Sequence, residues 1–312
     1  MNHHSSHTEI PIIDISSLLT PDYESNSTSK EIGDACRDMG FFYVVNHGIS
    51  KAHREEVFRE SKAFFQSPLE KKNEISSRGY DHYAGYVPMH GEITKGTADT
   101  HEAYDIIRET PPSHPDVLAG HPTKGPNQWP TWMKSFKGTM IQNWDLMENL
   151  GMAITKGIFQ SLGLEKQLMD QYMRDPVSEQ RALFYPGTKI KEQGIGAHKD
   201  YGFVTMVMQD TPGLEVLAKD GSWTTVEEVP NSFIVNLGYM VERWTNWVYP
   251  ATEHKVRTSK KDRTSVIFFT GPSTEIDISP LESCCTEGNP GKFATLNYGD
   301  YIKRKFAASY ES

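Results

Sequence analysis

The sequence contains little cysteine and no long apolar run. Its 312 residues include three cysteines, Cys36, Cys284 and Cys285, and the last two are adjacent, so a disulfide framework is not expected. No apolar stretch approaches the roughly 20 residues that a membrane-spanning helix needs. The polar N-terminus, MNHHSSHTEI, has no apolar segment typical of a secretory signal. We therefore expect a cytoplasmic protein with reduced thiols.

The chain also lacks an excess of basic residues. With 32 Lys and Arg against 41 Asp and Glu, its net charge is -9, which disfavours nucleic acids and anionic membranes as partners. No internal repeat or low-complexity segment is present, and we expect the histidine-rich first ten residues (His3, His4 and His7) to form a disordered tail. Hydrophobic residues make up 37% of the chain, enough for a sizeable core. We expect one compact unit, monomeric or weakly oligomeric.

The first half of the chain favours helices and a strand. Apolar residues at helical spacing predict helices over residues 28–39 and 51–67. The aromatic and β-branched run between them, bounded by glycines, predicts a strand over 40–49. A longer stripe of Met, Trp and Ile predicts a core-facing helix over 135–165, whose role is packing rather than cofactor binding.

Residues 78–132 interrupt this rhythm. They are rich in Gly, Pro, His and charged residues and show no sustained period. Long irregular stretches in compact domains are usually functional, so we expect residues 78–105 to form a mobile lid. On that interpretation His82, His90 and His101 are surface residues.

From about residue 180 the pattern changes to short strands. Segments such as RALFYP, FVTMVMQ, SFIVNLG and TSVIFF are separated by turn residues, and Asp220-Gly221 is a typical two-residue hairpin turn. Six or more strands with turns about every ten residues predict a sandwich, a barrel or a jelly roll. The expected fold is therefore mainly β, with helical support packed on it.

A candidate metal site lies in this β-rich half. The stretch IGAHKDYGFVTM places His198 and Asp200 two residues apart at the entrance to a predicted strand, and His254 follows before another. Two imidazoles and one carboxylate are the ligands of non-haem ferrous enzymes, and they leave three positions open on one face of the ion. The His-x-Asp pair alone is weak evidence, because such pairs also occur by chance in loops.

A candidate carboxylate clamp follows the third ligand. Arg263 and Ser265 point to one face of a predicted strand, where a guanidinium and a hydroxyl can bind a carboxylate. Tyr185, on an earlier strand, could add a second hydroxyl, although a core tyrosine without such a contact is also possible. The sequence thus predicts a metal site with a carboxylate receptor beside it.

These motifs resemble the isopenicillin-N-synthase-like branch of the Fe(II)/2-oxoglutarate-dependent dioxygenases over nearly the whole chain. The resemblance is carried by IPIIDISSLL, DACRDMGFFYVVNHGIS, AHKDYGFVTMVMQD, EHKV and DRTSVIFF. It implies a double-stranded β-helix, or jelly roll, with an N-terminal α/β region packed on it. The expected parts are a dioxygenase N-terminal region (9–125), a support helix (135–165), the jelly-roll core (176–277) and a C-terminal segment (278–312).

The resemblance also implies ligands and a reaction. His198, Asp200 and His254 would bind Fe(II), and Arg263, Ser265 and Tyr185 would bind the distal carboxylate of the cosubstrate 2-oxoglutarate. With dioxygen, the enzyme would release succinate and carbon dioxide while it hydroxylates, desaturates or cyclises a small molecule, for example in secondary metabolism.

Departures from the family pattern flank the metal residues. They are Tyr239 after Gly238, Trp247 after Asn246, and Leu183 two residues before the clamp tyrosine. They leave the iron prediction intact but argue against carrying over a plant substrate class, and the segment YAGYVPMHGEITKGTADTHEAYDI is closer to microbial members.

Three alternatives remain open. A 2-oxoglutarate-independent oxidase of the same fold would use the clamp for the carboxylate of its own substrate. A catalytically silent jelly-roll binding protein would keep the shape without the metal, and a cupin-type isomerase would favour more histidines. The substrate cannot be identified from these motifs, but an aromatic-lined pocket is expected. Its candidate substrate contacts are Tyr86, Phe203 and Phe269, with Tyr80 and Tyr83 nearby.

Overall fold

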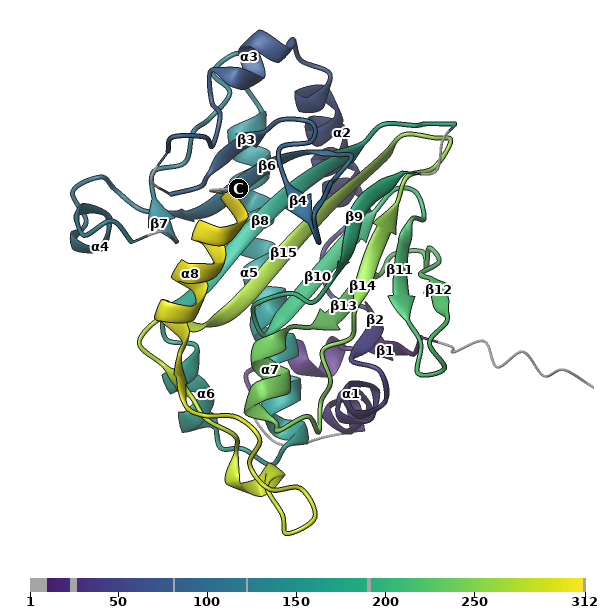
Figure 1. Ribbon diagram of the computed structural model, residues 1–312, viewed down its shortest axis with the longest axis vertical. Helices are drawn as coiled ribbons and strands as arrows, with labels where there is room; N and C mark the ends of the chain where they lie inside the picture. Colours follow the sequence, from purple (N-terminus) through teal and green to yellow (C-terminus); the bar gives the residue numbers. More distant parts are fainter. Residues whose placement is uncertain (1–9, 23–26, 81, 122, 190–191, 311–312) are drawn as a thin grey trace, which may run out of the picture.

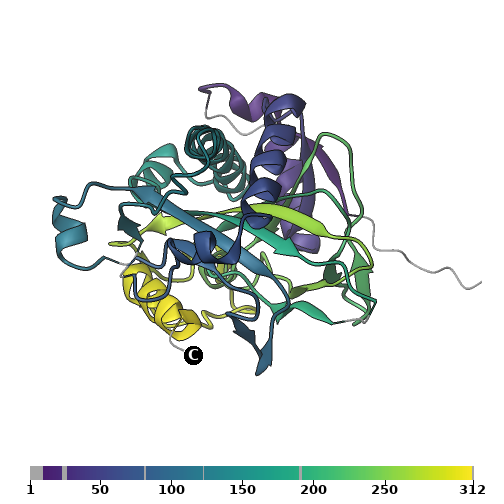
Figure 2. The ribbon, with the colours of Figure 1, turned by 90° about the horizontal axis from the view of Figure 1, so that it is seen from above.

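The computed structural model describes residues 10–22, 27–80, 82–121, 123–189 and 192–310. The histidine-rich tail predicted from the sequence lies outside this part of the chain. In the described residues two β-sheets are packed together with a layer of helices, as Figures 1 and 2 show from two directions. The prediction of a mainly β protein with helical support is confirmed.

The larger sheet of the described chain has nine strands. Its order is β1-β2-β13-β10-β15-β8-β6-β3, and β7 pairs with β6 at one end. All pairings are antiparallel except β1 with β2 and β6 with β7. The strands are β1 (Ile12–Asp14), β2 (Phe41–Val45), β3 (Gly85–Val87), β6 (Glu102–Glu109), β7 (Lys124–Gly125), β8 (Pro176–Tyr185), β10 (Val204–Gln209), β13 (Phe233–Leu237) and β15 (Arg263–Ser273).

A smaller antiparallel sheet faces the larger one. It contains β9 (Gln193–His198), β11 (Leu214–Leu217), β12 (Trp223–Thr225) and β14 (His254–Arg257), in the order β12-β11-β14-β9. Two short pairs lie outside both sheets: β4 (Ile93–Thr94) with β5 (Thr97–Ala98), and β16 (Asp277–Ile278) with β17 (Leu296–Asn297). Side chains from both sheets line one pocket, so the pocket lies inside the jelly roll.

Helices cover the outer face of the larger sheet, opposite the pocket. The helices are α1 (Ser27–Asp38), α2 (Lys51–Phe65), α3 (Leu69–Asn73), α4 (Pro115–Leu118), α5 (Phe136–Ser161), α6 (Lys166–Tyr172), α7 (Tyr239–Trp244) and α8 (Tyr298–Tyr310). Figure 2 shows α1, α2 and α5 on one side of the sheet and the yellow α8 on the other. No helix in the described residues is long and apolar enough to cross a membrane.

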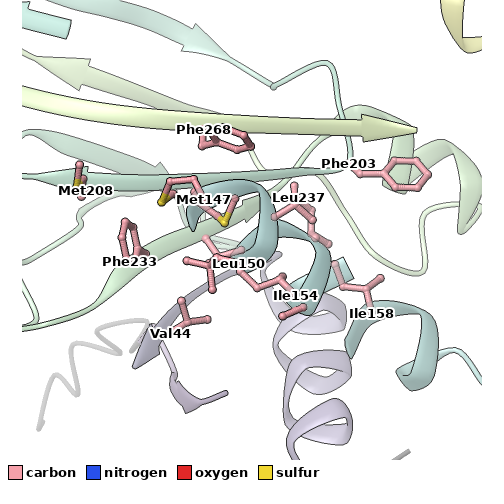
Figure 3. Close-up of a cluster of buried hydrophobic side chains, with 14 of the residues drawn as sticks. Val44, Met147, Leu150, Ile154, Ile158, Phe203, Met208, Phe233, Leu237 and Phe268 are labelled. Carbon is pink, nitrogen blue, oxygen red and sulfur yellow. The ribbon is translucent and has the colours of Figure 1, made fainter. Parts of the chain in front are cut away.

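The long helix α5 supports the strands that carry the site. Figure 3 shows Met147, Leu150 and Ile154 of α5 beneath Phe268 of β15 and Met208 of β10. These residues are at most 3% exposed. Because side chains alternate along a strand, the neighbours of Phe268 and Met208 point into the pocket instead. The predicted packing stripe is therefore confirmed, and it holds one wall of the pocket in place.

The interpretation of residues 78–132 as irregular is wrong. β3 and β6 lie within this segment and extend the larger sheet beyond β8. β6 has no visible period because five consecutive residues, 103–107, are buried, as expected for a strand covered on both faces. Only the β4–β5 hairpin lies over the pocket, so the lid stays a prediction for that hairpin alone.

Two histidines of this segment also differ from expectation. His82 and His101 are 8% and 2% exposed, so they are buried rather than surface residues. No helix is predicted for the C-terminal segment, yet α8 contributes side chains to the pocket. The three cysteines are free, as expected.

Candidate active site

The three predicted metal ligands converge at the open end of the smaller sheet. His198 ends β9 and His254 begins β14, and the two are direct cross-strand partners. Asp200 lies in the loop after β9, with Oδ1 3.4 Å from His198 Nε2 and 3.5 Å from His254 Nε2. The three ligand atoms lie within 4.8 Å of one another. Ligands about 2.1 Å from a shared ion at right angles lie about 3 Å apart, so the donor set fits an Fe(II) ion with little movement.

Backbone carbonyls orient both imidazoles. His198 Nδ1 lies 2.8 Å from the Gly196 carbonyl, and His254 Nδ1 lies 3.2 Å from the Thr252 carbonyl. A carbonyl only accepts hydrogen bonds, so each Nδ1 carries the hydrogen and each Nε2 presents its lone pair. Both lone pairs face Asp200, which is the arrangement that metal binding requires.

Two further side chains orient the carboxylate, and sequence reasoning missed both. Thr205 Oγ1 donates to Asp200 Oδ2 over 2.5 Å, and Asn236 Nδ2 donates to the same oxygen over 2.7 Å. Oδ1 is thereby left facing the two Nε2 atoms. Burial alone would raise the pKa of Asp200, but His254 and His198 hold it well below its usual range. The only sequence signals were a Thr and an Asn inside otherwise apolar strands.

Glycines allow the loop that carries Asp200 to approach its neighbours closely. A Cβ on Gly202 would lie 2.3 Å from the Thr270 carbonyl oxygen, and one on Gly238 would lie 2.2 Å from the Gly202 carbonyl oxygen. Tyr239 N donates to the Asp200 carbonyl over 2.8 Å. This last contact uses only backbone, so the departure from the family pattern at Tyr239 does not disturb the loop.

The predicted clamp residues lie together at the other end of the pocket. Arg263 is 2% exposed and faces Tyr185 directly across β15 and β8. Its Nε donates to the Thr211 carbonyl over 3.1 Å, and its Nη1 donates to Ser265 Oγ over 3.2 Å. Its Nη2 donates to Gln209 Oε1 over 2.8 Å, a contact that sequence reasoning also missed.

Arg263 and Tyr185 form a buried polar pair. The hydrogen bonds that Arg263 donates go to Thr211, Ser265 and Gln209, so among the described residues no carboxylate pairs with it. The buried Tyr185 hydroxyl lies close to Arg263 and Ser265 but forms no well-aligned hydrogen bond. The guanidinium carbon lies 4.8 Å from the Tyr185 ring centroid. Burial raises the pKa of Tyr185, and Arg263 offsets part of that rise, so the phenol stays a neutral donor. A buried cation beside an unpartnered hydroxyl is suited to bind the carboxylate of a ligand.

One pocket of about 380 Å³ contains both the metal residues and the clamp. Its walls come from alternate residues of β8, β10 and β15 on one side and from β9 and β14 on the other. Side chains of α8 and of the β4–β5 hairpin close the remaining side. These include Ile93, Thr94, Tyr298, Ile302 and Phe306. In Figure 1, α8 and β4 lie over β8 and β15 on this side.

Of the three predicted substrate contacts, one lines the pocket and two do not. Phe269 lines the pocket from β15. Tyr86 is fully buried beside Phe64, and Phe203 is 1% exposed and stacks on Trp244, so both belong to the hydrophobic core instead. The expectation for these two is wrong because aromatic content alone does not tell which face of a strand or loop is turned to the pocket.

Comparisons with known proteins agree with this geometry. Residues 10–132 match the family described as non-haem dioxygenase in morphine synthesis N-terminal, and residues 174–272 match the 2OG-Fe(II) oxygenase superfamily. A homoarginine-6-hydroxylase of Oryza sativa subsp. japonica is 33% identical, over 96% of this chain and 97% of its own. Another, from Arabidopsis thaliana, is 37% identical, over 96% of this chain and 89% of its own.

A solved structure adds a ligand-bound comparison. Neurospora crassa T7H in complex with alpha-KG and thymine superposes with a TM-score of 0.81 at 27% identity, covering 96% of both chains. The jelly-roll prediction is thereby confirmed. The chain belongs to the Fe(II)/2-oxoglutarate-dependent dioxygenases of the isopenicillin-N-synthase-like family, as its motifs predict.

Proposed function

We propose that His198, Asp200 and His254 bind Fe(II), and that Arg263, Ser265 and Tyr185 bind the distal carboxylate of 2-oxoglutarate. The observation that carries this assignment is the position, in one pocket, of a three-ligand cluster and a buried guanidinium that pairs with no carboxylate of the described residues. The family assignment makes the chain an oxidoreductase that uses Fe(II), 2-oxoglutarate and dioxygen on a small molecule.

Each protein group has a defined task in this proposal. Iron with 2-oxoglutarate and dioxygen supplies an oxidant that removes hydrogen from a C–H bond, with succinate and carbon dioxide as coproducts. Asp200 would contribute one negative charge and the two neutral imidazoles none, and a set of only three protein ligands would leave further positions for exchangeable ligands. Thr205 and Asn236 keep the carboxylate in one orientation. The two sheets and α8 line the pocket and would limit the access of water to a bound substrate.

We propose hydroxylation as the reaction. Several plant relatives are named homoarginine-6-hydroxylases, so L-homoarginine is the first substrate to test. Desaturation and cyclisation are the alternatives, and product mass distinguishes them. A cytoplasmic location and a monomeric or weakly oligomeric state stay predictions, as does the division into the four sequence segments.

Ligand binding and turnover test the residue assignments separately. We expect His198→Ala and Asp200→Ala to abolish stoichiometric Fe(II) binding, measured anaerobically, without loss of the folded structure. His114→Ala, at an exposed position outside the pocket, is the matched control. Undiminished iron binding in either ligand variant would refute the metal assignment.

The clamp is tested through the cosubstrate. We expect Arg263→Ala to raise the KM for 2-oxoglutarate at least about 30-fold, equivalent to about 2 kcal/mol for a lost charge-assisted contact. Arg174→Ala, on the exposed surface, should leave it unchanged. Succinate formation also separates the alternatives. An oxidase would turn over substrate without releasing succinate, and a silent binding protein would do neither.

A further inference from the structure

One wall of the pocket is charged, and the reaction assigned above does not use it. Along β8, alternate residues from Val177 to Tyr185 line the pocket. Two of them, Glu179 and Arg181, bring charge to a strand that has neighbours on both sides. Asp105 lies opposite Arg181 on β6. These three residues, with Glu92 and His101, form what we call the charged wall.

Most of the charged wall is internally paired. Arg181 Nη2 donates to Glu92 Oε2 over 2.5 Å, and its Nε lies 3.3 Å from Asp105 Oδ1. His101 Nε2 also contacts Glu92, over 2.9 Å. Burial alone would raise the pKa of Glu92, but Arg181 and His101 hold it below its usual range. Two carboxylates are therefore matched by a guanidinium and an imidazole.

The carboxylate of Glu179 has no such match. Within the described chain it forms neither a hydrogen bond nor an ion pair, although it lines the pocket. Burial, followed by repulsion from Asp105, raises its pKa to about 8. Lys305 of α8 lines the same pocket, with its Nζ 5.0 Å from the Tyr201 ring centroid. Glu179 thus lacks a partner cation, and its carboxyl group is mostly protonated at neutral pH; a cation placed beside it would favour the ionised form.

The cosubstrate does not reach this position. Glu179 is six residues from Tyr185 along β8, which corresponds to about 20 Å at the usual rise of a strand. It instead shares a cross-strand row with Phe269 and Thr205, and Thr205 supports the metal ligand Asp200. A molecule held at Glu179 therefore lies level with the metal residues and far along the strand from the clamp, at a position where the primary substrate can reach the metal residues without meeting the cosubstrate carboxylate.

Apolar side chains line the same pocket, among them Val177, Phe269, Ile302 and Phe306. Such surfaces fit methylene groups, and Glu179 is a lining carboxyl group that no Lys or Arg of the described chain pairs with. A cation carried by the substrate would favour the ionised form of Glu179 and supply the partner that the protein does not.

Resting on the proposed iron and 2-oxoglutarate sites, we propose that Glu179 is the residue that selects the substrate, and that it binds a cationic group, guanidinium or ammonium, carried on an aliphatic chain. The neutral analogue of such a substrate would leave the carboxylate without a partner. Discrimination between isosteric charged and neutral compounds is therefore the signature of this site.

Two matched pairs of compounds test the proposal. L-Homoarginine and L-homocitrulline differ by a guanidinium against a neutral ureido group, and L-lysine and L-2-aminoheptanoic acid by an ammonium against a methyl group. We expect one cationic member to bind the protein loaded with Fe(II) and 2-oxoglutarate without oxygen, at least about 10-fold more tightly than its neutral partner. The pair that shows this preference identifies which cation the pocket takes. Equal or inverted preference in both pairs, or binding by none of the four compounds, would overturn the proposal.

The variant Glu179→Gln assigns the preference to one side chain. It should abolish the preference while leaving the KM for 2-oxoglutarate, measured from slow substrate-free succinate release, within about twofold of wild type. Glu70→Gln, an exposed glutamate outside the pocket, is the control. A preference that survives in Glu179→Gln refutes the assignment. The wild-type comparison of each pair stands even if the variant fails to fold.

The failure of this proposal is distinguishable from failure of the proposed function. Wild-type protein that binds neither Fe(II) nor 2-oxoglutarate would contradict the assignment of the metal and clamp residues. Wild-type protein that binds both and releases succinate, but shows no preference for either cation, would contradict the role of Glu179 alone.

Discussion

The substitution Tyr185→Phe is expected to weaken cosubstrate binding without lowering the stability of the protein. The side chain is 1% exposed, and within the described residues its oxygen has no hydrogen-bond partner. A buried polar group without a partner costs about 1–3 kcal/mol. Removing this oxygen should therefore leave the ligand-free protein as stable as wild type, or stabilise it by about 1 kcal/mol.

The same substitution should weaken cosubstrate binding. A hydrogen bond to a charged group contributes about 1.5–3 kcal/mol, so losing one to the 2-oxoglutarate carboxylate corresponds to a rise in KM of about 10- to 100-fold. The assays are urea unfolding of the ligand-free protein and succinate formation against 2-oxoglutarate concentration. A variant that is both more stable and weaker in binding is the expected outcome.

The control is Tyr249→Phe. Tyr249 is also fully buried, but its hydroxyl contacts Ser161 Oγ over 2.9 Å. Its loss should destabilise the protein by about 1 kcal/mol and leave the KM for 2-oxoglutarate unchanged. If Tyr185→Phe destabilised the protein as Tyr249→Phe does, or left the KM for 2-oxoglutarate within about twofold, Tyr185 would be an ordinary core tyrosine and not part of the clamp.

Three further predictions concern groups around the site. Thr205→Val removes a donor to the carboxylate ligand and should lower Fe(II) affinity about 10-fold in an anaerobic titration; unchanged affinity would contradict its supporting role. Gly238→Ala places a Cβ 2.2 Å from the Gly202 carbonyl and should lower the free energy of unfolding by about 1–3 kcal/mol, with weaker iron binding. Burial would raise the pKa of Glu92, but Arg181 lowers it below the ordinary glutamate value of 4.5. The ion pairs of Glu92 therefore stabilise the protein fully above pH 4.5, and this contribution is lost progressively as the pH falls below that value. Glu92→Gln should accordingly cost about 3 kcal/mol at pH 7 and progressively less below pH 4.5 in urea unfolding; a cost independent of pH would refute the ion-pair reasoning.

The sequence predicts the metal residues because their signal is local. His198 and Asp200 are two residues apart, and His254 directly precedes a strand, so the donor types and their order are visible without knowledge of the fold. The residues that orient Asp200 are different. Thr205 and Asn236 come from adjacent strands, and only the register of β10 against β13 places them at one oxygen.

The errors in predicting the fold have a related cause. β6 lacks the alternation of a half-exposed strand because it is covered on both faces, so its apolar run gave no readable period. Tyr86 was expected in the pocket and lies in the core, since aromatic side chains are suited to both environments. Helix α8 contributes to the pocket although nothing in its sequence indicates where it packs.

The charged wall can be recognised in the sequence only when the position of β8 in the sheet is known. The segment SEQRALFY alternates Glu179 and Arg181 with residues that pack toward α5, which by itself is compatible with an exposed strand face. β8 is instead an interior strand, and its two charged side chains face the pocket. Charges in such a place are expensive unless they are paired or bind a ligand. Arg181 is paired and Glu179 is not, so the carboxylate that the fold leaves without a partner is the one most directly suited to choose the substrate.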